Sequence, residues 1–169
     1  MKRTQTKQIH VGSVAIGGGA PVAVQSMCNT HTSDAHATIE QIARLHDAGC
    51  EIIRLAVPDQ AAADALPEIV RAAPIPVVAD IHFDYRLALA AAKAGVHKIR
   101  INPGNIGEPD NVRKVAEACR ERGIPIRIGV WKSVCSKSTV TRRRRHSSRA
   151  HRGTLTCCTG MILTTLPCR

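Results

Sequence analysis

The sequence predicts an α/β fold: an incomplete TIM (β/α) barrel of about five parallel strands, preceded by an N-terminal hairpin and followed by a disordered basic tail. Short apolar, β-branched runs alternate with longer alanine-rich runs whose apolar residues recur at helical spacing. The repeat of roughly 25 residues suits a (β/α) barrel or a doubly wound sheet. The strand runs are almost continuously apolar, as in parallel strands that are covered on both faces.

The elements follow in a regular order. Residues 7–24 are expected to form the hairpin, with its turn at Gly12 and Ser13. Asp34 is expected to cap the start of the first helix, and Gly49 is expected to end this helix. Pro67 is expected to interrupt the second helix. No helix directly follows the glycines at 17–19, so a flexible connection is favoured there over a phosphate loop. Strands are predicted at 22–28, 50–58, 75–83, 97–104 and 124–130, and helices at 34–49, 59–73, 85–95 and 108–123.

Charge divides the chain into two parts, 1–130 and 131–169. The first part carries all 13 acidic and 15 of the 24 basic residues, whereas the last 39 residues carry nine basic residues and no acid. The sequence pI of about 9.9 therefore averages two different kinds of sequence. The seven cysteines form no CxxC pair and no disulfide framework, and no metal site is predicted. Without a signal peptide or an apolar run of membrane-spanning length, we expect a soluble, cytoplasmic protein without membrane contact.

Polar side chains recur where the predicted strands end. The C-terminal ends of parallel barrel strands open on one face, so these side chains are expected to meet there. Arginines that converge on that face indicate a highly anionic ligand, because guanidinium groups bind phosphate oxygens in bidentate fashion. A single such arginine is more often a surface group, but the same placement recurs in five successive strands. The residues are Gln25, Ser26, Arg54, Asp80, His82, Arg100, Asn102, Asn105 and Arg127.

Three longer strings carry a resemblance to a known family. They are VAVQSMCNTHTSDAHATIEQIARLHDAGCEIIRLAVP, PVVADIHFDYRLALAA and KIRINPGNIG. These strings resemble the N-terminal part of 4-hydroxy-3-methylbut-2-en-1-yl diphosphate synthases, and the similarity runs from about residue 3 to residue 130. Cys28 stands where that family usually has threonine. Another phosphate-binding TIM barrel, such as a pterin-related synthase, fits these strings less well.

The resemblance implies a function in isoprenoid biosynthesis. That family reductively opens 2-C-methyl-D-erythritol 2,4-cyclodiphosphate to 4-hydroxy-3-methylbut-2-enyl diphosphate, as a homodimer that takes electrons from flavodoxin or ferredoxin. By this resemblance Arg54, Arg100 and Arg127 correspond to a diphosphate clamp, and Asp80, His82 and Asn102 to neighbouring pocket residues. The [4Fe-4S] cluster of the family is bound by a separate C-terminal domain, and none of the seven cysteines here matches its motif.

The resemblance ends abruptly after Val130. With suitable synonymous codons, reading residues 131–141 one base out of phase yields LEERLLEKYGH, which restores acids and helical periodicity. We therefore interpret residues 131–169 as a non-homologous, frame-shifted tail, and we expect the chain to be an inactive, marginally folded or aggregating fragment. The alternative is a small basic nucleic-acid-binding protein that uses the arginine run at 142–145. Polyanions would in any case bind this tail incidentally.

Overall fold

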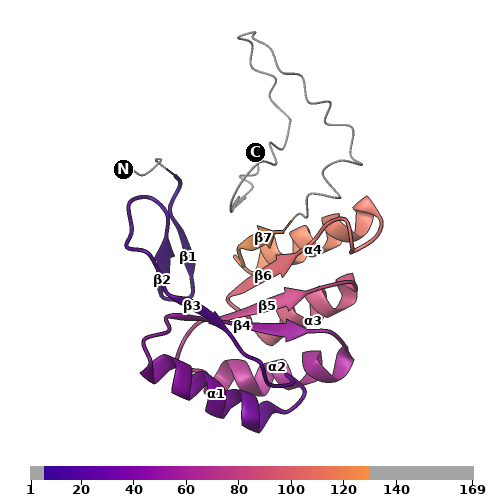
Figure 1. Cartoon of the computed structure of the whole chain (residues 1–169). Helices are drawn as coiled ribbons and strands as arrows, with labels where there is room; N and C mark the ends of the chain where they lie inside the picture. The colour runs from indigo at the N-terminus through magenta and orange to yellow at the C-terminus, as the bar shows by residue number, and fades with distance from the viewer. Residues whose placement is uncertain (1–5, 130–169) are drawn as a thin grey trace, which may run out of the picture.

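A five-stranded parallel sheet forms the body of the computed structural model, which describes residues 6–129 (Figure 1). Its strands lie in the order β3-β4-β5-β6-β7, so each strand pairs with the next one along the chain. This order suits a barrel wall, because a doubly wound sheet reverses its strand order part-way. The strands are β3 (Gln25–Met27), β4 (Ile52–Val57), β5 (Val77–Ile81), β6 (Lys98–Ile101) and β7 (Ile126–Ile128).

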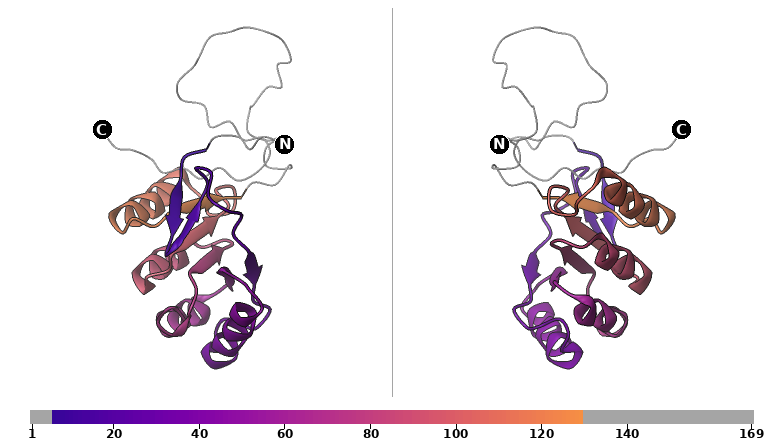
Figure 2. Two further views of the ribbon diagram at one scale, coloured as in Figure 1. Left: turned by 90° about the vertical axis from the view of Figure 1, so that its left-hand side faces the viewer. Right: turned by 90° about the vertical axis from the view of Figure 1, so that its right-hand side faces the viewer.

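Four helices connect these strands and lie side by side in chain order along the sheet (Figures 1 and 2). They are α1 (Ala35–Asp47), α2 (Gln60–Ala72), α3 (Tyr85–Ala94) and α4 (Pro109–Glu121). Asp34 caps α1 as predicted, since its carboxylate accepts a hydrogen bond from the Ala37 amide at 3.0 Å. Alternate strand residues, such as Leu55, Ala79 and Ile99, pack with the helices into one buried apolar cluster. The helices therefore cover only one face of the sheet.

The N-terminal hairpin covers part of that opposite face. Strands β1 (Ile9–Val11) and β2 (Val14–Ile16) pair antiparallel around Gly12 and Ser13, as predicted. A second buried cluster joins Ile9 and Val11 of the hairpin to Ile52 of β4 and Val78 of β5. Gly12 has a φ of +58°, and a Cβ there would lie 2.9 Å from side-chain atoms of Pro76 and His97. Since Pro76 and His97 directly precede β5 and β6, the hairpin lies at the N-terminal ends of these strands.

Three local predictions need correction. Helix α2 contains Pro67 and continues through it, and the buried Leu66 and Ile69 on either side hold it against the sheet. Strand β3 is only three residues long. Glycines 17–19 all have positive φ, and a Cβ on Gly17 or Gly18 would meet residues 6–8 at under 3.0 Å. These glycines therefore form a tight turn that requires glycine, where we had expected a flexible connection.

The predicted tail, residues 131–169, lies outside the described residues. Within residues 6–129, β3 and β7 each have one neighbouring strand and form the two edges of the sheet. No helix in this part of the chain is long and apolar enough to cross a membrane.

Candidate functional site

Strand register brings most of the predicted polar residues onto the face of the sheet that the helices do not cover. Asp80 pairs with Arg100 across β5 and β6, and Arg100 pairs with Arg127 across β6 and β7. Directly paired residues of neighbouring strands point to the same face, so these three side chains form one row. Arg54 lies two residues before Ala56, the partner of Asp80, and is thus on the same face. His82 and Asn102 follow this row by two residues, beyond the ends of β5 and β6.

The carboxylate of Asp80 is the centre of this cluster. Its side chain is 2% exposed, and its Oδ1 accepts a hydrogen bond of 2.7 Å from Nη1 of Arg100. The other carboxylate oxygen, Oδ2, lies 3.5 Å from Nε of Arg54 and 4.0 Å from Nε2 of His82. Asp80 therefore orients two guanidinium groups, and both remain partly accessible to solvent.

Other neighbouring groups also fix the orientations of the Arg54 and Arg100 side chains. The Arg54 guanidinium donates to the thioether sulfur of Met27, with Nη2 at 3.0 Å. The Arg100 guanidinium lies over Gly129, where a Cβ would be 2.8 Å from Nη2. Gly129 therefore leaves the room that Arg100 needs to reach Asp80.

Asn102 carries a buried donor at the same end of the sheet. It is 3% exposed, and its Oδ1 accepts a hydrogen bond from the Gly104 amide at 3.1 Å. Its Nδ2 is buried and has no hydrogen-bond partner among residues 6–129. A buried donor without a partner is costly, so Nδ2 of Asn102 is a candidate donor to a ligand.

Two polar residues predicted for this site lie elsewhere, and one residue was missed. Ser26 pairs with Ile53 and shares its helix-facing side, while Gln25 pairs with Ile52 and lies on the face of Arg54, but nearer the hairpin. Lys98, which was not predicted, lies on the face of Arg100 because it precedes Arg100 by two residues in β6. The alternation of charged and apolar residues in KIRI could have revealed it.

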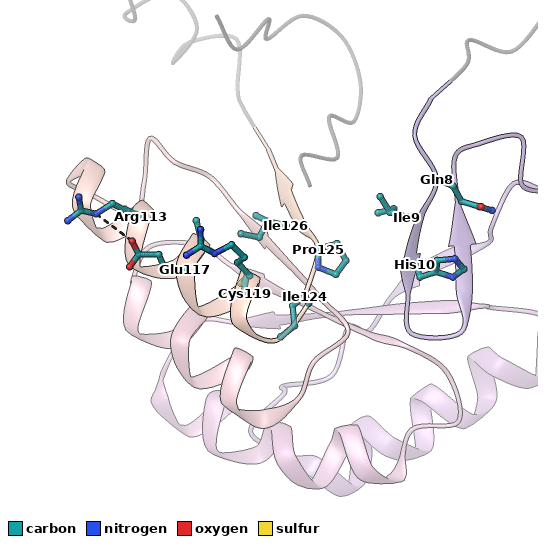
Figure 3. A pocket seen from close by; sticks show the side chains of 12 residues that line it. Gln8, Ile9, His10, Arg113, Glu117, Cys119, Ile124, Pro125 and Ile126 are labelled. Atoms are coloured by element: carbon teal, nitrogen blue, oxygen red, sulfur yellow. Dashed lines mark ion pairs between the residues drawn. The ribbon is translucent and has the colours of Figure 1, made fainter. Parts of the chain in front are cut away.

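A separate hollow of about 510 Å³ lies away from the arginine cluster, between α4, the start of β7 and the hairpin (Figure 3). Its lining includes Ile9, Cys119, Ile124 and Ile126. This hollow lies towards the N-terminal end of β7, whereas the charged groups lie towards the C-terminal ends of the strands. We therefore take the arginine cluster, and not this hollow, as the candidate functional site.

The described cysteines do not fit the [4Fe-4S] cluster that the family resemblance implies. Cys28, Cys50 and Cys119 are buried, and burial raises the pKa of Cys28 and of Cys119 to about 11. Cluster ligands are thiolates, which such pKa values disfavour. Among residues 6–129, no three His, Cys, Asp or Glu side chains are grouped so that they could hold a metal ion.

Comparison with known proteins identifies the family of this chain. The family model of the GcpE TIM-barrel domain matches residues 6–159. The chain belongs to the GcpE TIM-barrel family. This membership agrees with the parallel sheet and its consecutive strand order.

Several relatives match about three quarters of the chain. The flavodoxin-type 4-hydroxy-3-methylbut-2-en-1-yl diphosphate synthase of Maridesulfovibrio salexigens is 58% identical over 130 residues, which are 77% of this chain and 36% of the relative. The enzymes with the same name from Geobacter sulfurreducens and Ruminiclostridium cellulolyticum are each 60% identical, over 128 and 130 residues, and cover 76% and 77% of this chain. The chain thus spans little more than a third of the length of these relatives.

Solved structures resemble the GcpE chain more weakly. The match to a dihydropteroate synthase of Xanthomonas albilineans covers 70% of this chain and 48% of the synthase chain, with 14% sequence identity and a TM-score of 0.47. A similarity at this level carries no argument about function.

Proposed function

We propose that residues 6–129 form the diphosphate-binding part of a 4-hydroxy-3-methylbut-2-en-1-yl diphosphate synthase. The proposed substrate is 2-C-methyl-D-erythritol 2,4-cyclodiphosphate, which the whole enzyme would open reductively to 4-hydroxy-3-methylbut-2-enyl diphosphate. One observation carries the proposal: three arginines share one face of the sheet with a single paired carboxylate, Asp80. Such an excess of guanidinium groups suits a diphosphate, whose oxygens accept paired hydrogen bonds.

Each side chain has a role in this proposal. Arg54, Arg100 and Arg127 bind phosphate oxygens, and Asp80 holds the first two in position. Asn102 donates from its unpaired Nδ2 to a ligand oxygen. His82, next to Asp80 and partly exposed, lines the opening of the pocket. The electrons for the ring opening would come from a [4Fe-4S] cluster outside this part of the chain, so no chemical step is assigned to the described residues.

The partners of the whole enzyme are also part of the proposal. Flavodoxin would supply the electrons, as the names of the relatives state for those proteins, and ferredoxin is the alternative donor. We further propose a cytoplasmic setting and a homodimer for the whole enzyme. The present chain would bind the substrate without turning it over.

Calorimetric titration of the cyclodiphosphate into the monomeric fraction of the full chain tests the binding role. We expect Arg100→Met to weaken binding by tenfold or more, since hydrogen bonds to charged groups contribute about 1.5–3 kcal/mol each. Arg113→Met, on the exposed surface of α4, is the matched control and should leave the affinity unchanged. Equal loss in both variants, or no binding by the unaltered chain, would refute the proposal.

We propose a frame-shift as the origin of residues 131–169, which lie outside the described residues. The nucleotide sequence around the codon for Val130 tests this origin, and the absence of family-like sequence in the other frame would exclude it. A gel shift with arbitrary DNA tests the alternative function. A salt-dependent shift that is lost on deleting residues 131–169, together with no diphosphate binding, would favour the nucleic-acid-binding protein.

A further inference from the structure

Lys98 is a buried cation on the same face as the arginines. It is 1% exposed although it carries an ammonium group, and its register partner across β5 is Val78, which packs against the hairpin. Arg54 is the next residue in that row, because it pairs with Val78 from the other side. Lys98 therefore lies one step deeper than the row of Asp80, Arg100 and Arg127, between that row and the hairpin.

No carboxylate side chain in the chain neutralises Lys98 or Arg127. All 13 acidic residues lie between Asp34 and Glu121, within the described residues, and none is within ion-pairing distance of either cation. Arg54 and Arg100, in contrast, both contact Asp80. Burial lowers the pKa of Lys98, and the nearby charge of Arg127 lowers it further. Lys98 is buried and Arg127 is half-buried, so the repulsion between these two cations is unfavourable unless an anion lies near both.

We infer that Lys98 and Arg127 together form a deep subsite for one phosphate group of the ligand, beside Arg100 and reaching further towards the hairpin. The inference rests on the proposed function and adds a binding residue, Lys98, to it. An anionic phosphate oxygen near both cations would turn their repulsion into attraction. Arg54 and Arg100, with their positions set by Asp80, would bind the second phosphate group. The cost of burying Lys98 in the ligand-free protein would then be recovered on binding.

Lys98→Met tests this inference, because methionine preserves most of the side-chain volume and removes the charge. We expect calorimetry with the cyclodiphosphate to show at least about tenfold weaker binding. The thermal midpoint of the ligand-free variant should equal or exceed that of the unaltered chain, since an unpaired buried charge is removed. Lys93→Met, at an exposed position near the end of α3, is the control and should keep the original affinity.

The outcomes separate this inference from the proposed function. If the unaltered chain binds and Arg100→Met weakens binding while Lys98→Met does not, the deep subsite is wrong and the proposed function stands. If the unaltered chain does not bind, the proposed function fails. Loss of cooperative unfolding in Lys98→Met would make Lys98 a structural residue and would also contradict the inference. Arg127→Met is the second variant, and it must weaken binding as Lys98→Met does.

Discussion

The ion pair between Asp80 and Arg100 yields a quantitative prediction about stability. Asp80 is almost fully buried, and its Oδ1 lies 2.7 Å from Nη1 of Arg100, which is 19% exposed. At an effective dielectric constant of about 20, opposite charges about 3 Å apart attract by roughly 5 kcal/mol. Desolvation of the carboxylate offsets much of this attraction. We therefore expect a coupling free energy of about 2 kcal/mol between the two residues.

A double-mutant cycle measures this coupling. Arg100→Met should lower the free energy of unfolding by about 3 kcal/mol, because it leaves Asp80 with Arg54 as its nearest cation at 3.5 Å. Asp80→Asn should cost about 2 kcal/mol, and the double variant about 3 kcal/mol instead of the sum. Urea unfolding of the full chain, followed by circular dichroism, provides the three values.

The surface pair of Asp110 and Arg113 is the control for this cycle. Their nearest charged atoms are 3.5 Å apart, but the side chains are 75% and 70% exposed. A cycle through Asp110→Asn and Arg113→Met should therefore show a coupling below about 0.5 kcal/mol. If the Asp80 and Arg100 changes also add within about 0.5 kcal/mol, the reasoning about the buried carboxylate is refuted.

Three further predictions concern the hairpin and the buried titratable groups. Burial lowers the pKa of His97 below its ordinary 6.5, and its Nδ1 accepts a hydrogen bond from the Val77 amide. The unfolded chain therefore binds a proton at this histidine more readily than the folded chain does. The free energy of unfolding should be highest above about pH 6.5 and should fall as the pH drops below this value. His97→Gln should flatten this slope in urea unfolding at several pH values, and an unchanged slope would contradict the assignment. Gly12→Ala should destabilise the chain by about 1–2 kcal/mol more than Gly19→Ala does. Both positions have positive φ, but of the two only a Cβ at Gly12 would lie within 4 Å of other atoms. Equal thermal midpoints of the two variants would disprove this prediction. With a pKa of about 11, roughly one in a thousand Cys28 and Cys119 thiols is ionised at pH 8, so iodoacetamide should label them slowly until urea unfolds the chain, as peptide mass spectrometry would show; rapid labelling of the folded chain would count against these values.

Local patterns in the sequence were sufficient to predict most of the fold. The apolar runs became the parallel strands, and Asp34 caps its helix, because both depend on residues close in the chain. Pro67 was misjudged because its effect depends on distant packing: Leu66 and Ile69 hold α2 against the sheet. The glycines at 17–19 were misjudged for a similar reason, since residues 6–8 pack against their turn.

The sequence by itself determined which charged residues follow the strands, and thus that an anion site was to be expected. Tertiary structure decided how these residues are paired. Register places Asp80 between Arg54 and Arg100, leaves Lys98 and Arg127 without a carboxylate and turns Ser26 towards the helices. The physical reason is that a shift of one residue in strand pairing would turn every side chain to the other face. Contacts between strands therefore decide which charges meet, and no local pattern of residues contains that information.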